Sequence, residues 1–222
     1  MATYKVVEKF VSINGEGTRA GQLAVFVRFA GCNLDCDYCD TSWANKSDVS
    51  YEEMTEFEIY DYIKATGIRN VTLTGGEPLL RENIDKLLRI LSSDKYIRTE
   101  IETNGSVEIE QFREISDNIS FTVDYKLPGS GMERYMELSN YDNLNMQDTV
   151  KFVVSDIADL VRAKEIIEEN GLTEKCNVYI SPVFGIIDPE VMVKFMVENK
   201  MNDVNMQLQL HKIIWDPDRR SV

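Results

Sequence analysis

Short apolar runs alternate with amphipathic segments along most of the chain. The apolar runs are rich in Val, Ile and Phe and contain no internal proline, as is typical of buried strands. We therefore predict strands at residues 23–30, 70–74, 98–102, 119–124, 149–154, 177–180 and 204–209. Strands separated by helical segments at this spacing indicate a parallel sheet with helices packed outside it.

Helix start and stop signals lie between the predicted strands. Ser50 and Glu53 have the spacing of a capping box, and we expect them to begin a helix that ends before Gly67. Ser155 is the expected N-cap of a helix through Asn170, in which apolar residues follow the helical period. Further helices are expected over residues 84–91 and after the cap Asp188, where Pro189 takes the first helical position.

The number of strand–helix units limits the fold class. A closed eight-stranded barrel needs ~250 residues, so we predict an α/β fold that is a partial, open TIM-like barrel of about six parallel βα units. No linker or repeat marks a second domain. We expect one domain over residues 1–222, divided into an N-terminal strand or loop (1–22), a core (23–210) and a C-terminal tail (211–222).

Composition and charge narrow the class of function. With 43% hydrophobic and 28% charged residues, the chain is neither disordered nor fibrous. The 38 acidic and 24 basic side chains give a net charge of −14, which argues against a nucleic-acid partner. No apolar run approaches the roughly 20 residues that span a bilayer, and the N-terminus lacks the pattern of a secretory signal. We expect a cytoplasmic protein with no nucleic-acid or membrane partner.

Cys32, Cys36 and Cys39 form a CxxxCxxC cluster directly after the first predicted strand. Polar residues separate them, so they are neither a hydrophobic core nor, in a reducing compartment, a disulfide framework. Metal binding is the better interpretation. Only Cys176 and His211 remain as further thiol or imidazole ligands, and Cys176 lies in an apolar segment typical of a core thiol. We therefore predict an iron–sulfur cluster with one iron left open. The alternative is zinc bound by the three cysteines and His211.

The cysteine motif, with the aromatic Tyr38 before its last cysteine, resembles the signature of the radical S-adenosylmethionine (SAM) superfamily. The segments Thr74-Gly75-Gly76-Glu77-Pro78 and Glu102-Thr103-Asn104-Gly105, which follow the next two strands, are similar to motifs of the same superfamily. The resemblance implies a radical SAM core with a [4Fe–4S] cluster on the three cysteines. It also implies that SAM is bound by Tyr38, Cys39, Asp40, Gly75, Gly76, Glu77, Glu102, Asn104, Asp124, Tyr125, Lys126, Ser181, Pro182, Val183 and Phe184.

Within that superfamily, the chain looks most similar to the 7-carboxy-7-deazaguanine synthase family. The likeness rests on residues 12–18, residues 26–32, the Cys39-Asp40-Thr41 run, the short length and residues 209–212 with the tail. It implies ring contraction of 6-carboxy-5,6,7,8-tetrahydropterin with loss of ammonia, in queuosine or deazapurine biosynthesis, with Mg²⁺ at Thr41. The implied substrate contacts are Ile13, Asn14, Gly15, Glu16, Arg28, Thr74, His211 and Val222.

The chemistry of these residue types suits that substrate. The Glu16 carboxylate can accept hydrogen bonds from the amino and ring N–H groups of a pterin. Arg28 lies in an alternating strand, so we expect it to be buried and to need an anion, which the substrate carboxylate would supply. A neutral Thr41 hydroxyl is a weak ligand for Mg²⁺, which indicates that the metal binds together with substrate oxygens.

The family resemblance also implies partners. The cluster and SAM perform the chemistry, so no side chain is expected to be catalytic, and an external one-electron donor such as flavodoxin or ferredoxin is required. We expect a homodimer, since a partial barrel has edges to cover. One alternative is a glycyl-radical enzyme activating enzyme, in which the same three cysteines would serve the same chemistry, directed at a glycine of a partner protein. The other is a non-catalytic iron–sulfur or zinc protein. A nucleic-acid-binding role ranks below these.

Overall fold

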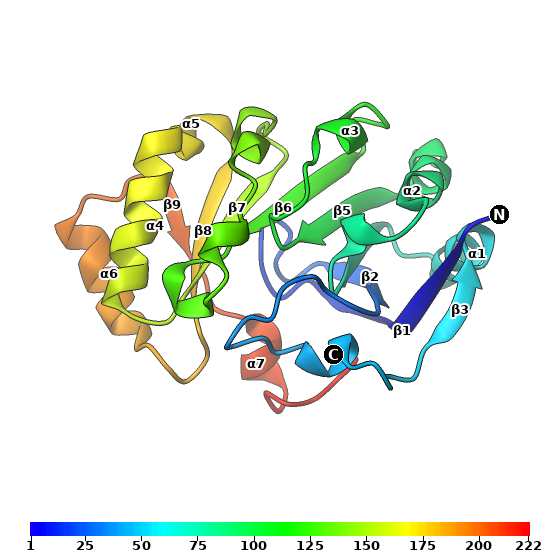
Figure 1. Cartoon of the computed structure of the whole chain (residues 1–222), viewed down its shortest axis with the longest axis horizontal. Helices are drawn as coiled ribbons and strands as arrows, with labels where there is room; N and C mark the ends of the chain where they lie inside the picture. The colour runs from blue at the N-terminus through cyan, green and yellow to red at the C-terminus, as the bar shows by residue number, and fades with distance from the viewer.

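The computed structural model describes all of residues 1–222, and one curved sheet runs through the whole chain (Figure 1). Its nine strands follow the order β3-β1-β2-β4-β5-β6-β7-β8-β9. The strands are β1 (Thr3–Ile13), β2 (Leu23–Phe29), β3 (Glu52–Thr55), β4 (Asn70–Gly75), β5 (Arg98–Thr103), β6 (Ile119–Tyr125), β7 (Thr149–Val154), β8 (Asn177–Pro182) and β9 (Val204–Met206). The helices are α1 (Glu56–Thr66), α2 (Ile84–Ser93), α3 (Glu110–Arg113), α4 (Ile157–Asn170), α5 (Leu172–Lys175), α6 (Pro189–Glu198) and α7 (Leu210–Ile214).

The strands from β2 to β9, with β3 excepted, are parallel and lie side by side in sequence order. At one end β1 adds to β2 in the antiparallel sense, and β3 adds to β1 in the same way. Strands β3 and β9 are the two edges and do not pair with each other. The prediction of an open, partial barrel is therefore confirmed. A single sheet over the chain agrees with one domain over residues 1–222, which stays a prediction.

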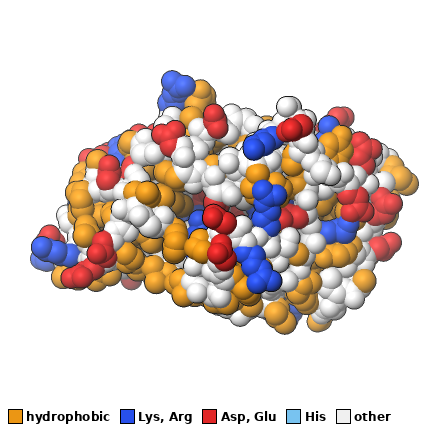
Figure 2. All heavy atoms as spheres, turned by 90° about the horizontal axis from the view of Figure 1, so that it is seen from below, with side chains coloured by type: hydrophobic (Ala, Val, Ile, Leu, Met, Phe, Trp, Pro, Cys, Tyr) orange, Lys and Arg blue, Asp and Glu red, His pale blue; other side chains and the backbone are white.

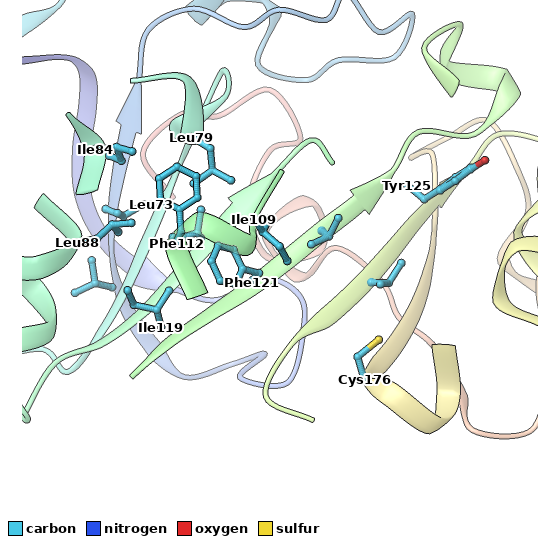
Figure 3. Close-up of a cluster of buried hydrophobic side chains, with 14 of the residues drawn as sticks. Leu73, Leu79, Ile84, Leu88, Ile109, Phe112, Ile119, Phe121, Tyr125 and Cys176 are labelled. Carbon is cyan, nitrogen blue, oxygen red and sulfur yellow. The ribbon is translucent and has the colours of Figure 1, made fainter. Parts of the chain in front are cut away.

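The hydrophobic core lies between the convex face of the sheet and the helices α1 to α6, which run along its outside (Figure 1). It is one cluster of 38 buried residues. Cys176 belongs to it at 3% exposure, and its thiol donates to the carbonyl oxygen of Leu172 (Figure 3). This confirms the prediction of a packed core thiol. No helix has both the length and the apolar content that a bilayer crossing requires.

The helix caps differ from those we predicted. The capping box is formed by Thr55 and Glu58, because residues 52–55 pair with β1 as strand β3 and push the helix start downstream of Ser50. Helix α4, for which we predicted Ser155 as the N-cap, is capped by Asp156, whose Oδ1 accepts from the amide of Asp159. Short capping patterns recur along a polar segment, so strand pairing and packing decide which of them is used. The strand predicted over residues 204–209 is also shorter and ends at Met206.

A β-bulge in β1 changes which side chains face the inside of the barrel. Val6 lies opposite Phe29, whereas Glu8 lies opposite Arg28, so one extra residue stands between the two pairs. Before the bulge, even-numbered residues such as Val6 are buried against the helices; after it, Glu8 and Phe10 line the concave side. A bulge re-aims the residues that follow it in this way. The N-terminal segment therefore contributes polar groups to the interior of the barrel.

Candidate active site

A cavity of about 620 Å³ opens at the carboxyl ends of the parallel strands, where chemistry is expected in such folds. Its walls come from three parts of the chain: the loop after β2, the strand ends and the C-terminal tail. In Figure 1 that loop, α7 and the end of the chain lie together below the sheet. Figure 2, viewed from that side, shows acidic and basic side chains close together near the centre of the face.

The three clustered cysteines line this cavity and are half-buried. The sulfur of Cys32 accepts hydrogen bonds from the amide of Leu34 and from Nδ2 of Asn104, both at 3.4 Å. Burial raises the pKa of Cys36 to about 11, although the Lys126 ammonium opposes the shift. Positive charge from bound iron is what holds such a thiol as thiolate, and N–H groups aimed at the sulfur tune its electronics.

The arrangement does not bring ligands to the single point that one metal ion requires. No three His, Cys, Asp or Glu side chains anywhere in the chain converge closely enough to hold one ion. The alternative of zinc bound by the three cysteines and His211 is therefore not supported. In an iron–sulfur cubane each thiolate binds a different iron, so the thiols surround a volume and do not meet at a point.

The glycines after β4 make room for the cysteine loop. A Cβ on Gly76 would stand 1.8 Å from the carbonyl oxygen of Gly31 and 2.7 Å from the amide nitrogen of Cys32. The amide of Glu77 also donates to the Gly31 carbonyl at 3.0 Å. Only a residue without Cβ lets the two backbone segments approach so closely. Gly75 and Gly76 both line the cavity.

The carboxylate of Glu77 is not among the groups that line the cavity, and the predicted contact of this residue with SAM stays a prediction. It is wholly buried and accepts from the amide of Asn104 at 2.6 Å, the amide of Leu79 at 3.0 Å and the hydroxyl of Thr103 at 2.9 Å. Burial raises the pKa of Glu77 to about 6 in spite of these donors. The side chain joins the end of β4 to the end of β5 and so holds the backbone of Asn104, whose side-chain Nδ2 donates to the sulfur of Cys32.

Charged side chains from several strands meet on the inner wall of the cavity. The Lys151 ammonium lies 3.2 Å from Oδ1 of Asp124 and 3.4 Å from Oε2 of Glu16, and Lys126 lies 2.6 Å from Oδ2 of Asp124. Burial alone would raise the pKa of Asp124, but Lys126 and Lys151 outweigh it and lower that pKa. Burial opposes the charge of Lys151 as well, and Asp124, Glu16 and Glu102 nevertheless raise its pKa. Burial also raises the pKa of Glu102, although Lys151 opposes the shift.

Lys151 was not among the residues that we predicted, although its sequence carries a signal. It is the only charged residue in the run Thr149-Val150-Lys151-Phe152-Val153-Val154, which reads as a buried strand. A lysine in such a strand is buried only if it is paired. The identity of its partners, however, depends on how far β6 and the N-terminal loop lie from β7 in space.

The loop between β1 and β2, which we predicted to bind substrate, reaches across the interior of the barrel to β8. Oε1 of Glu16 accepts from the hydroxyl of Ser181 at 2.8 Å, and Ser181 is fully buried behind the cavity wall. Asn14 is also buried, and its Oδ1 accepts from the hydroxyl of Thr72. Ser181 therefore supports Glu16 through its hydroxyl, whereas the Asn14 side chain bonds to Thr72. The predicted ligand contacts of Asn14 and Ser181 stay predictions.

Arg28 is partly buried and paired, but its anion comes from the chain. Its Nε donates to Oε1 of Glu8 at 2.8 Å, and both side chains line the cavity. This corrects the expectation that substrate alone supplies the anion. The next cross-strand pair, Phe10 and Phe26, stacks with ring centroids 5.0 Å apart on the same wall. Glu8 and Phe10 were missed because the bulge in β1 turns them toward the cavity. Phe26, on β2, was not singled out either.

The far wall of the cavity combines the end of the cysteine loop with the tail. The Tyr38 hydroxyl donates to the carbonyl of Val153 at 3.0 Å, and the Thr41 hydroxyl lies 3.6 Å from the sulfur of Cys39. Lys212 lies 3.5 Å from Oδ2 of Asp40. His211 packs against Gly15, and burial lowers its pKa, so the imidazole is neutral near pH 7.

The structure brings together most of the residues that the sequence predicted. Those that line the cavity are Ile13, Gly15, Glu16, Arg28, Cys32, Cys36, Tyr38, Cys39, Asp40, Thr41, Thr74, Gly75, Gly76, Glu102, Asn104, Asp124, Lys126, Val183, Phe184, His211 and Val222. Pro182 lines an adjacent apolar pocket instead. Tyr125 is one of the buried core residues (Figure 3). Its hydroxyl donates to Glu133 at 2.7 Å, and its predicted SAM contact stays a prediction.

Comparisons with known proteins agree with this geometry. The sequence model of the Radical SAM superfamily matches residues 26–129. The 7-carboxy-7-deazaguanine synthase of Clostridium acetobutylicum is 61% identical over 219 residues, which cover 99% of each chain. The relative of the same name from Chlorobaculum tepidum is 36% identical and covers 100% of this chain and 98% of its own. The crystal structure of QueE from Escherichia coli has the same fold, with a TM-score of 0.74 at 21% identity over 93% of this chain and 94% of that one.

Proposed function

Because this chain belongs to the 7-carboxy-7-deazaguanine synthase family of the radical SAM superfamily, we propose that it converts 6-carboxy-5,6,7,8-tetrahydropterin into 7-carboxy-7-deazaguanine with loss of ammonia. The enzyme is a radical SAM carbon–nitrogen lyase that uses a [4Fe–4S] cluster, SAM and Mg²⁺. The observation that carries the proposal is that the three cysteines and the Arg28–Glu8 pair line one cavity. A cluster site and an anion-binding site within one cavity suit a reaction that joins SAM to a carboxylated substrate.

When bound, the cluster and SAM supply a carbon-centred radical that removes hydrogen from the substrate. The chain's contribution is to bind and orient the ligands and to exclude water from the site. Cys32, Cys36 and Cys39 would hold three irons, and Asn104 would fix the sulfur of Cys32 through its amide. The narrow gap at Gly76 leaves no side chain between β4 and the cysteine loop, which places backbone groups next to the cluster site.

The strand ends beside the cysteines form the proposed SAM site. Asp124 and Lys126 present a carboxylate and an ammonium to the cavity, as a zwitterionic amino acid group requires. Gly75, Gly76 and Glu102 stand at the ends of the neighbouring strands. The proposed contacts to the rest of SAM are Tyr38, Cys39, Asp40, Asn104, Val183 and Phe184.

The proposed substrate site lies toward β1 and β2. Arg28 would bind the substrate carboxylate with its terminal nitrogens, since Nε is already committed to Glu8. Glu16 would accept from the pterin N–H groups while Lys151 and Ser181 hold it in place. Ile13, Gly15, Thr74, His211 and Val222 would complete the contact surface, and the Thr41 hydroxyl would join substrate oxygens around Mg²⁺.

Several finer points belong to the same proposal. The C-terminal tail lines the cavity beside the cysteines, which favours a small substrate over a glycine on a partner protein. We infer an external one-electron donor such as flavodoxin or ferredoxin, because no second cluster motif occurs in the sequence. A homodimer, a cytoplasmic location and the absence of a nucleic-acid partner are proposed on the family resemblance and the net charge of −14.

The experiment that tests the function is anaerobic reconstitution with iron and sulfide, followed by product analysis. The reconstituted protein receives carboxytetrahydropterin, SAM, Mg²⁺ and a reductant, and 7-carboxy-7-deazaguanine and ammonia are quantified. Arg28→Ala should raise the KM for the pterin and leave that for SAM nearly unchanged. A reconstituted cluster that cleaves SAM but forms no deazapurine would rule out the proposed substrate.

A further inference from the structure

One carboxylate in the cavity wall is bonded to two parts of the site at once. Oε1 of Glu8 accepts from Nε of Arg28 at 2.8 Å, and Oε2 of the same group accepts from the hydroxyl of Ser221 at 3.1 Å. Ser221 lies 213 residues further along the chain, in the C-terminal tail. The side chains of Glu8 and Arg28 are 12% and 16% exposed, so their pairing takes place largely out of solvent.

The tail has a second attachment next to the cysteine loop. The guanidinium of Arg220 lies 3.9 Å from the ring centroid of Trp43, within the range of a cation–π contact. Trp43 belongs to a short 3-10 helix, Ser42–Asn45, that follows the cysteine motif directly. Both attachments belong to residues 217–222, all of which line the cavity. The tail is therefore tied to the Arg28 side of the cavity by Glu8 and to the cysteine side by Trp43.

The hydrogen bonding of Arg28 leaves its two terminal nitrogens available for a ligand. Its Nε is used by Glu8, while its terminal nitrogens form no hydrogen bond within the chain. A guanidinium held through Nε by a carboxylate has few remaining rotamers, so its terminal fork points in a fixed direction. Without Glu8 the charge would be unpaired and free to turn, and it would be a poorer receptor for an anion.

We propose that Glu8 is a positioning residue that couples docking of the C-terminal tail to recognition of the substrate carboxylate by Arg28. This inference rests on the proposed function for the identity of the anion. Docking of Ser221 fixes the Glu8 carboxylate, and the fixed carboxylate orients Arg28 toward the cavity. Since coupling between two binding events is reciprocal, an anion bound to Arg28 also strengthens docking of the tail.

Limited trypsin cleavage measures tail docking directly, because Arg219 and Arg220 lie within the tail. Anaerobic, unreduced holoenzyme is digested with and without carboxytetrahydropterin, and intact mass reports loss of the last residues. We expect Glu8→Gln to be cleaved several-fold faster than wild type without ligand. The pterin should slow cleavage of wild type and have no effect on Glu8→Gln. Ser221→Ala should fall between the two.

Glu52→Gln is the matched control. Glu52, on β3, pairs with Lys9, which follows Glu8 in β1. Neither residue lines the cavity, so this variant removes a neighbouring ion pair without touching the cavity. It should be cleaved and protected as wild type is. Equal ligand-free cleavage of wild type and Glu8→Gln would overturn the proposal.

Steady-state kinetics separate positioning from general damage. Glu8→Gln should raise the KM for the pterin about tenfold, which corresponds to about 1.4 kcal/mol, with the KM for SAM unchanged. An unchanged KM for the pterin, or an equal rise in both KM values, would overturn the coupling. If wild type does not turn over the pterin, the proposed function fails, and the ligand-free cleavage rates still decide whether Glu8 holds the tail.

Discussion

Oε1 of Glu16, on the loop between β1 and β2, accepts a hydrogen bond of 2.8 Å from the hydroxyl of Ser181, which lies 165 residues later on β8. The same loop makes two further hydrogen bonds through its backbone. The amide of Gly17 donates to the side chain of Gln207 at 2.8 Å, and the amide of Leu210 donates to the carbonyl of Gly15 at 3.2 Å.

These contacts join the two ends of an open sheet. β3 and β9 are its unpaired edges, yet the loop after β1 reaches across the interior to the segment after β9. A full barrel removes its edges by pairing the last strand with the first. Here a loop with a glutamate at its centre makes the connection, so the residue proposed to bind substrate also closes the fold.

Replacing a clustered cysteine tests the cluster assignment. Alanine in place of Cys32, Cys36 or Cys39 should abolish the visible sulfur-to-iron absorption after reconstitution and all turnover, because each thiolate holds one iron. Cys176→Ala is the control and should retain both, since that thiol is packed in the core. Iron analysis and absorbance spectra check both expectations. Iron loss in Cys176→Ala would show that the ligand set is wrong.

Gly76→Ala should prevent cluster binding while leaving most of the sheet intact. The new methyl group would meet backbone atoms of Gly31 and Cys32 at 1.8–2.7 Å, and backbone cannot rotate away as a side chain can. We expect iron content to fall well below the about four atoms per chain of a full cubane. Gly185→Ala is the control, because its positive φ strains an added side chain but no atom lies within 4 Å to clash with it. Full iron loading in Gly76→Ala would contradict the close approach.

Lys151→Met should leave Glu16 and Asp124 without their shared counter-charge. Removing one partner of a buried ionic group costs about 3 kcal/mol or more, so urea unfolding should show a lower free energy of unfolding. Because Lys151 lowers the pKa of Asp124, the acidic limb of the activity profile should move to higher pH. Lys151→Arg should restore part of both properties.

Lys175→Met is the matched control for that variant. Lys175 also pairs with a carboxylate, Asp142 at 3.3 Å, but on the surface away from the cavity. Its loss should cost less than about 1 kcal/mol and leave the pH profile in place. If Lys151→Met behaves like Lys175→Met, the charged wall of the cavity has no energetic role.

Glu77 should make stability depend on pH in the acidic range. Its pKa is raised from 4.5 to about 6 by burial, so the folded state binds the proton more tightly than the unfolded state does. Its contribution is therefore most favourable below pH 4.5 and declines as the pH rises to about 6, by about 2 kcal/mol in all.

Glu77→Gln removes that titration. Over the same window the free energy of unfolding of wild type should fall relative to that of the variant, as measured by urea unfolding of the anaerobic apoprotein at several pH values. Glu174→Gln, at an exposed position, should track wild type throughout. A wild-type-minus-variant difference that stays constant between pH 4.5 and 6 would mean that folding does not raise the pKa of Glu77.

Part of this protein could be predicted from local patterns alone. The apolar runs located the parallel strands, and the CxxxCxxC spacing and the Gly75-Gly76 pair identified two segments that line the cavity. Each of these signals lies within about ten consecutive residues. Strand periodicity, ligand spacing and glycine tolerance act on the local backbone, so they can be recognised before the chain is folded.

The remaining features depended on contacts between distant segments. Whether Ser50 or Thr55 capped α1 was decided by the pairing of β3 with β1, and the bulge in β1 turned Glu8 into the cavity. The partners of Lys151 come from the first loop and from β6. Local sequence specifies which groups are charged or apolar, but register and long-range packing decide which of them meet, because those depend on the free energy of the whole sheet.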